Sequence, residues 1–422
     1  MPKTPPKATG PKQSIAPPLA LALAAAVLFW LTIQPKHEHF DYTFRIAGAL
    51  LHGHVGLASD PGSWLNEFVP ANGEYYSVFP LGAVLSLLPV ALLKEVGLIN
   101  SFPGGLVATV IVGLCVYSFY RLADLEPQQS RLRRVLLALF PIFATWSWCN
   151  LGQGGAWQIA LGFALFGQTG ALYFTLVRPR PLLAGACFAL AFGNRTELIL
   201  TCPIYLYWWI FPVSESNRDR PSPRGRPKPA PDRKPLRERW QTPAWFLAIP
   251  VVLGLSTAAY NFVRFGSIFD FGYALIPNLI TEPWYRHGLF SFSAIPWNVY
   301  KMLFEGMRDI PEFPFLQPYP FGCSIFLASP FLFLLFREGG KHKVLAWLAI
   351  ASLTLILWCH GNPGGWQFSY RYAMILLPWM FILLVSNGPR KLSANEAVLF
   401  VVSAAINAMA VYQFLWTESI TP

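Results

Sequence analysis

Apolar runs separated by short polar segments recur along almost the whole sequence, and they constrain the fold more than any other feature. Long apolar runs with few charges are typical of helices that cross a membrane. From these runs we predict eleven membrane-spanning helices, at residues 16–33, 103–120, 135–149, 157–177, 181–193, 197–213, 243–262, 321–336, 344–359, 372–386 and 396–416.

The composition also indicates that the protein lies in a lipid bilayer. Hydrophobic residues make up 54% of the chain and charged residues 13%, which would leave a soluble globule with too little polar surface to cover itself. A helical bundle in a bilayer buries itself as one unit, so the length does not imply several domains. The sequence therefore predicts an all-α fold, a polytopic transmembrane helical bundle. Residues 16–422 are expected to form one domain after a disordered cytoplasmic N-terminus at residues 1–15.

The distribution of the basic residues also fits a membrane protein. The chain has 32 Lys and Arg residues and a formal net charge of +11. They lie in short tracts between apolar runs, so we expect them to set the topology and expect no nucleic-acid partner. With a cytoplasmic N-terminus, 23 of the 32 fall in cytoplasmic segments and 9 outside. This bias predicts an integral, multi-pass membrane protein whose C-terminus lies outside and whose surroundings are membrane lipid.

Three long polar segments interrupt the apolar runs. Residues 34–102 are predicted to form a first outer loop with juxtamembrane helices, and residues 263–320 a second long outer loop. Segment 214–240 is rich in Pro and Arg, and we predict a disordered basic cytoplasmic loop there. Because long loops gathered on one face carry function more often than short connections do, we expect the working surface outside, at the membrane boundary.

One apolar stretch, VFPLGAVLSLLPVALL at residues 78–93, is not predicted to span. It is interrupted by Pro80 and Pro89, and counting it as a span would place the arginines of residues 121–134 on the outer face. We therefore expect it to lie along the outer leaflet, or to dip into it, without crossing.

Neither the cysteines nor the histidines form a strong metal-binding pattern. The six cysteines are scattered without C-x-x-C spacing, which favours neither a disulfide framework nor a zinc site. His37 and His39 lie beside Asp41 in an H-x-H pattern that suits a divalent metal, but this spacing alone is a weak signal. We expect interfacial histidines and no cofactor, with a divalent metal near His37, His39 and Asp41 as the alternative.

Motifs in the first outer loop resemble a known family. The loop opens HFDYTFRIAGALLHGHVGL and later runs into YYSVFP. This order is similar to the start of the GT-C superfamily of membrane glycosyltransferases, in which an acidic residue after the first span is followed by a helix ending in glycine and then by Y-Y-x-x-x-P. The matching positions are Asp41, Gly53, Tyr75, Tyr76 and Pro80. The family includes protein O-mannosyltransferases and aminoarabinose transferases, which use polyprenyl-phosphate sugars.

Three further segments strengthen the resemblance, which covers most of residues 16–385: FGNRTELILTCP, YNFVRFGSIFDFGYAL and GGWQFSYRYAMILLPWM. The resemblance implies transfer of a hexose or pentose from a polyprenyl-phosphate donor, with inversion, at the outer face, whether periplasmic, extracellular or lumenal. The acceptor, a lipid, glycan or protein, is not identified by the sequence.

Such a transfer requires a base for the acceptor hydroxyl and cations for the departing phosphate. The resemblance assigns Asp41 as the catalytic base and Arg371, Arg264 and Arg195 as donor-phosphate ligands. An alternative interpretation of Asp41 is an ion pair with Arg45 on the next helical turn. For the three arginines, the alternative is snorkelling to lipid headgroups.

Other polar residues of these motifs are expected to support the site, namely Glu38, Arg45, Tyr75, Tyr76, Asn261 and Tyr370. The second acidic residue that the family has in its first loop is not evident, and Glu38 or Asp60 is its nearest candidate. A noncatalytic scaffold with the GT-C fold therefore stays open. A transporter or flippase of a lipid-linked saccharide is the other alternative, although the sequence has no internal repeat and no midplane charge of the kind typical of transporters.

Overall fold

The computed structural model describes residues 15–34, 40–211, 236–340, 342–417 and 419–420 of the chain. Almost all of the expected disordered N-terminus, the segment that holds His37, Glu38 and His39, and most of the basic loop at 214–240 lie outside the described residues.

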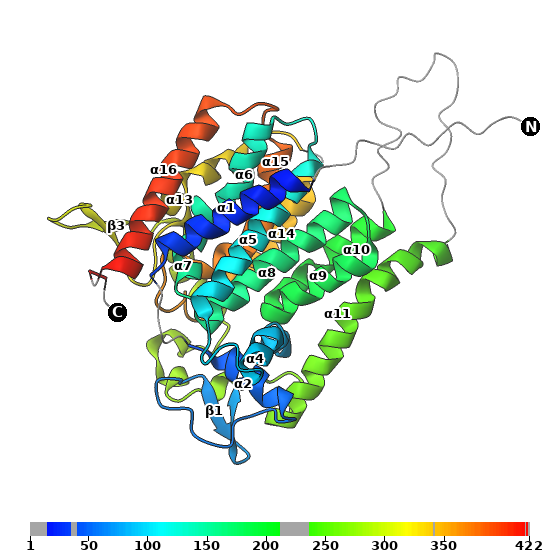
Figure 1. Ribbon diagram of the computed structural model, residues 1–422, viewed down its shortest axis with the longest axis vertical. Helices are drawn as coiled ribbons and strands as arrows, with labels where there is room; N and C mark the ends of the chain where they lie inside the picture. The colour runs from blue at the N-terminus through cyan, green and yellow to red at the C-terminus, as the bar shows by residue number, and fades with distance from the viewer. Residues whose placement is uncertain (1–14, 35–39, 212–235, 341, 418, 421–422) are drawn as a thin grey trace, which may run out of the picture.

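The described chain is mostly helical, and its helices lie side by side in one bundle (Figure 1). In chain order they are α1 (Ala16–Thr32), α2 (Tyr42–Leu51), α3 (Leu81–Leu85), α4 (Leu88–Glu95), α5 (Gly104–Leu122), α6 (Arg131–Phe143), α7 (Ser147–Gly152), α8 (Ala156–Leu172), α9 (Pro181–Asn194), α10 (Cys202–Ile210), α11 (Leu236–Phe265), α12 (Ile295–Leu303), α13 (Ile325–Ala328), α14 (Lys343–Cys359), α15 (Leu377–Ser386) and α16 (Ala394–Val411). Helix α11 begins seven residues before the span predicted at 243–262, inside the segment expected to be a disordered loop.

Four helical segments of the described residues are long and apolar enough to cross a membrane: Gly104–Leu125, Ala156–Val177, Trp240–Phe265 and Ala394–Trp416. Shorter apolar helices occupy Ala16–Thr32, Pro181–Asn194, Lys343–Cys359 and Arg371–Ser386. The other predicted ranges also contain helix, but it is broken into shorter pieces. In residues 321–336, for example, α13 is followed by a 3-10 helix at Pro330–Phe336, because proline cannot donate the hydrogen bond that would continue the preceding helix.

The described residues are mostly helical, as the all-α prediction expects, and they also contain four short strands. Strands β1 (Phe68–Ala71) and β2 (Glu74–Ser77) form an antiparallel hairpin, and β3 (Met307–Asp309) pairs with β4 (Leu316–Pro318). The first hairpin turns at Asn72 and Gly73, whose φ angles are +52° and +83°. An Asn-Gly pair with two positive φ angles is a strong hairpin signal, so this sheet was readable in the sequence.

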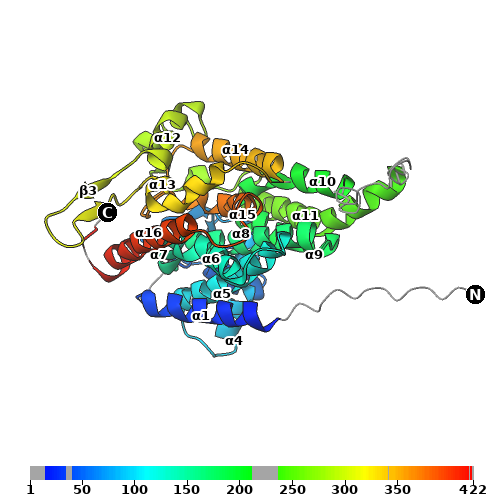
Figure 2. The same ribbon diagram turned by 90° about the horizontal axis from the view of Figure 1, so that it is seen from above.

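Helix α15 lies at the centre of the bundle, with α1 and α4 on one side and α12 and α14 on the other (Figure 2). All of its residues from Leu377 to Val385 are buried. The neighbouring helices approach closely at glycines. A Cβ atom on Gly167 of α8 would lie 2.7 Å from the backbone of α9, and one on Gly185 of α9 would lie 2.0 Å from the backbone of α11. Small residues at crossings allow such close packing in membrane proteins.

One end of the bundle carries a buried charge cluster. Arg133 at the start of α6 donates to Glu396 at the start of α16 at 3.1 Å, and Arg337 donates to the same carboxylate at 2.7 Å. Nearby, Arg134 pairs with Asp124 at 2.6 Å. The segments around residues 121–134, 337 and 396, predicted to lie on one side of the membrane, thus meet at one end of the fold.

The opposite end carries α2, α3, α4 and the first hairpin, which lie together at the lower edge of Figure 1. Residues 78–93 do not form one continuous helix there, since α3 and α4 are separated at Ser86 and Leu87. Helix α3 rests on the C-terminal end of α9, where a Cβ atom on Gly82 would lie 2.5 Å from the backbone of Gly193. This contact places the first long loop against the end of the bundle.

Candidate functional site

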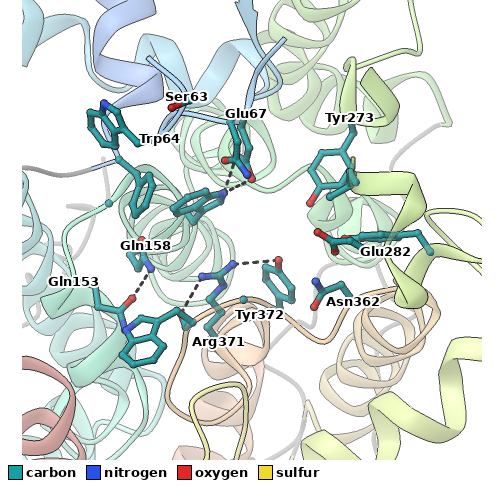
Figure 3. Close-up of a pocket in the computed structure, with 18 residues that line it drawn as sticks. Ser63, Trp64, Glu67, Gln153, Gln158, Tyr273, Glu282, Asn362, Arg371 and Tyr372 are labelled. Atoms are coloured by element: carbon teal, nitrogen blue, oxygen red, sulfur yellow. Dashed lines mark hydrogen bonds between the residues drawn. The ribbon is translucent and has the colours of Figure 1, made fainter. Parts of the chain in front are cut away.

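A polar cavity of about 530 Å³ lies where the two long loops meet the end of the bundle (Figure 3). Its volume falls within the range of about 300–1,000 Å³ that is typical of small-molecule sites. Its wall consists of two carboxylates, one guanidinium, side-chain amides, hydroxyls and aromatic rings, from Phe40, Ser63, Trp64, Asn66, Glu67, Gln153, Gly155, Trp157, Gln158, Tyr273, Leu279, Glu282, Tyr285, Asn362, Gly365, Trp366, Arg371 and Tyr372.

Glu67 is the carboxylate that the fold holds most tightly. It directly precedes β1, and the indole Nε1 of Trp157 donates to both of its oxygens at 2.9 Å. Trp157 lies on the first turn of α8, which begins where the backbone N–H of Ala156 donates to the carbonyl of Phe40 at 2.8 Å. Burial raises the pKa of Glu67 to about 7, although the Trp157 hydrogen bond and the charge of Arg371 oppose the rise. Glu67 can therefore exchange a proton near neutral pH.

Arg371 supplies the cation of the cavity. It begins a 3-10 helix at Arg371–Leu376, and its side chain donates to the Trp366 carbonyl at 3.4 Å and to the Tyr372 hydroxyl at 3.5 Å. Among the described residues, none accepts a hydrogen bond from its buried Nε. Within the described part of the chain, no carboxylate forms an ion pair with Arg371. A buried guanidinium of this kind suits an anionic ligand.

Arg195 stands close to this cavity without being one of its lining residues. Its guanidinium lies 4.8 Å from the centre of the Tyr372 ring, and it pairs with Glu197 at 2.9 Å. Its charge also acts on Glu67, where it lowers the carboxyl pKa. Of the three arginines predicted to bind phosphate, Arg371 thus lines the cavity, and Arg195 contacts Tyr372, which is one of the lining residues.

The structure does not bring Asp41 and Arg371 into one cavity. Asp41 lies at the N-terminus of α2 and is not a lining residue, although its neighbour Phe40 is. Its carboxylate accepts from Arg45 at 2.8 Å across one helical turn. This ion pair is the alternative interpretation that the sequence left open, and Glu67 occupies the place in the cavity that was expected for Asp41.

Arg264 is likewise absent from the cavity wall. It is fully buried in α11, donates to the Ser77 carbonyl and to Asn261 Oδ1, and lies against the Tyr260 ring. Its own carbonyl accepts from Asn72 at 3.2 Å. Arg264 therefore attaches the β1–β2 hairpin to the end of α11, and Asn261 holds the Arg264 side chain.

The other residues expected to support the site have structural contacts. The Tyr75 backbone pairs with Leu57, and the Tyr76 ring packs against Phe265. The buried hydroxyl of Tyr370 donates to Asn298 Oδ1 at 3.1 Å. Glu38 lies outside the described residues. Within the described ranges, no group of three or more His, Cys, Asp and Glu side chains is arranged to hold a metal ion.

Sequence reasoning missed several features of the cavity, above all Glu67 and its contact with Trp157. Glu67 stands ninety residues before Trp157 in the chain, and no motif marks either position. Tyr273 and Glu282 come from the second long loop and Asn362 from the turn after α14 (Figure 3). The expectation that function gathers on the long outer loops pointed toward Tyr273 and Glu282, but not toward Asn362.

Comparison with known proteins leaves the site to be interpreted from its own geometry: no protein-family model matches the sequence, and no curated protein and no solved structure matches the chain.

Proposed function

We propose that the chain is a membrane glycosyltransferase of the GT-C type, which moves a sugar from a polyprenyl-phosphate donor to an acceptor bound in the cavity. One observation carries the proposal. A carboxylate able to accept a proton near neutral pH, Glu67, shares a cavity with a buried guanidinium, Arg371, that no described carboxylate neutralises.

The proposed reaction is a single displacement at the anomeric carbon. The acceptor hydroxyl loses its proton to Glu67 while its oxygen bonds to the anomeric carbon, and the bond from that carbon to the phosphate oxygen breaks. The phosphate leaves with both bonding electrons, and Arg371 stabilises the charge that it gains. In this proposal Glu67 takes the role that the sequence assigned to Asp41.

The rest of the wall suits a sugar. Trp64, Trp157 and Trp366 provide aromatic surface, and the amides of Gln158 and Asn362 provide donors and acceptors for hydroxyl groups. A mixture of aromatic rings and amides fits a polyhydroxylated ligand better than a purely apolar one.

The proposal includes eleven membrane crossings, with the N-terminus in the cytoplasm and the C-terminus and the cavity outside. This topology is supported by the positions of the Arg133–Glu396 cluster and the cavity, which lie at opposite ends of the helices. Segment Arg371–Ser386 is short, but its first part is a 3-10 helix, which rises more per residue than an α-helix does. Six 3-10 residues at about 2.0 Å and ten α residues at about 1.5 Å cover roughly 27 Å, close to the hydrocarbon thickness of about 30 Å.

Cysteine labelling of intact cells tests this topology. In a cysteine-free background, an impermeant maleimide is expected to label Asn72→Cys and to leave Ser222→Cys unlabelled until the membrane is opened. Labelling of Ser222→Cys alone in intact cells would invert the topology.

The activity is tested with purified protein in liposomes, radiolabelled polyprenyl-phosphate hexoses and pentoses, and a membrane extract as the source of acceptor. We expect one donor to be consumed, with release of polyprenyl phosphate and transfer of label to the extract. A donor that crosses the bilayer uncleaved would indicate a flippase instead, and failure to bind any donor would indicate a scaffold.

A further inference from the structure

Trp157 contacts two of the three charged side chains of the cavity, Glu67 and Arg371. Its Nε1 donates to both Glu67 oxygens at 2.9 Å, and its ring centroid lies 5.7 Å from the Arg371 guanidinium carbon. No other described side chain has a hydrogen bond to the Glu67 carboxylate and a cation–π contact with Arg371.

The indole is itself held firmly. The ring centroids of Phe40 and Tyr42 lie 4.9 Å and 5.4 Å from that of Trp157. Gly155, at the N-cap of α8, lies close by, since a Cβ atom there would be in ordinary van der Waals contact with Phe40 at 3.6 Å and with the Trp157 ring at 3.8 Å. Phe40 directly precedes Asp41 and Tyr42 begins α2, so the indole orientation depends on how this part of the chain packs on α8.

We infer that Trp157 is a positioning residue, which favours the ionised form of the Glu67 carboxylate and holds it beside Arg371. The inference rests on the proposed function for its catalytic consequence, but the state of the carboxylate can be measured without any substrate.

The physical reason lies in the chemistry of the bond. Indole N–H is a donor only, so it stabilises the carboxylate and offers nothing to the donor O–H of a protonated carboxyl group. Burial alone would raise the pKa of Glu67 further, and the Trp157 bond is the strongest of the effects that lower it. Removing the N–H should therefore leave Glu67 protonated at neutral pH, when it cannot act as a base.

Infrared titration of the carboxyl band tests the inference, with Glu67→Gln subtracted to isolate the signal of Glu67. In Trp157→Phe the midpoint should rise by about one pH unit or more, the size expected for losing a hydrogen bond to a charged group. Replacement of Trp157 by benzothienylalanine, which keeps the bicyclic shape and lacks the N–H, should give the same rise and so exclude an effect of a smaller ring.

Trp366→Phe is the matched control, because Trp366 also lines the cavity and, in the described part of the chain, its side chain has no hydrogen bond to Glu67. Its midpoint should stay at the wild-type value. An unchanged midpoint in both Trp157 replacements would overturn the inference.

The pH dependence of kcat/KM provides a second test. Trp157→Phe should reduce kcat/KM at pH 7 by about tenfold and recover most of the loss at pH 9, when Glu67 ionises again. A uniform loss at both pH values would indicate a purely structural role and overturn the inference. If the midpoint shifts as expected but wild-type protein consumes no donor, the inference about Glu67 stands and the proposed function fails.

Discussion

The two ends of the bundle use buried arginine in opposite ways. At one end, Arg133 has its three nitrogens occupied by Glu396, by the Gln129 amide and by the Leu384 carbonyl. At the other end, Arg371 has two long contacts and an Nε without a partner. Both side chains are buried, at 1% and 6% exposed respectively.

The different numbers of partners indicate that Arg133 stabilises the fold, whereas Arg371 can bind a ligand. A buried cation costs free energy unless an opposite charge and hydrogen bonds compensate it. At Arg133 the protein provides that compensation itself, so the cluster has no capacity left for a ligand. At Arg371 the compensation is incomplete, and a phosphate is the ligand that we propose to complete it.

The largest expected effect is on stability. Glu396→Gln keeps the side-chain size but leaves Arg133 and Arg337 without their shared carboxylate, so the free energy of unfolding should fall by about 3–5 kcal/mol. Arg371→Gln should change it by less than about 1 kcal/mol, because no described carboxylate loses a partner. Denaturant unfolding in detergent measures both. Equal losses would remove the distinction between the two ends.

The next effect is on donor binding. Arg371→Gln should weaken binding of polyprenyl phosphate by about ten- to a hundredfold, the value of a charge-assisted hydrogen bond. Arg337→Gln, a change of the same kind at the opposite end, should leave it unchanged within about twofold. Binding to the immobilised protein in detergent measures this, and equal loss in both variants would count against a specific phosphate site.

The sequence predicted those features of the fold that depend on residues close together in the chain. Apolar runs located the helices, and the break at Pro80 and Pro89 correctly indicated that residues 78–93 are not one continuous helix. The Asn72–Gly73 turn was an available hairpin signal that an all-α reading passed over.

The candidate site was predicted only in part. Arg371 was placed by a motif of its own segment, and the Asp41–Arg45 pair follows from helical spacing alone. The contact between Glu67 and Trp157 depends on how the first long loop folds back on α8, for which a single sequence has no signal. The contact of Arg264 with Ser77 could not be predicted for the same reason, since Ser77 lies in that loop.

The smallest expected effect is a pH dependence. Because the base must be ionised, kcat/KM should rise about tenfold per pH unit below the Glu67 pKa of about 7 and level off above it. The sign for stability is opposite: the folded protein keeps the proton longer than the unfolded chain, so the contribution of Glu67 declines as the pH rises from 4.5 to about 7. A rate profile that is flat between pH 5 and pH 8 would exclude Glu67 as the base.

We propose that Glu67 of the cavity is the base, and that Asp41, which pairs with Arg45 at the N-terminus of α2, is not. Single-turnover transfer from the consumed donor, measured with Glu67→Gln and Asp41→Asn side by side, tests it most directly. Glu67→Gln should lower the transfer rate by about a hundredfold or more while donor binding persists, and Asp41→Asn should lower it by less than about fivefold. The reverse order, with Asp41→Asn inactive and Glu67→Gln active, would contradict the account.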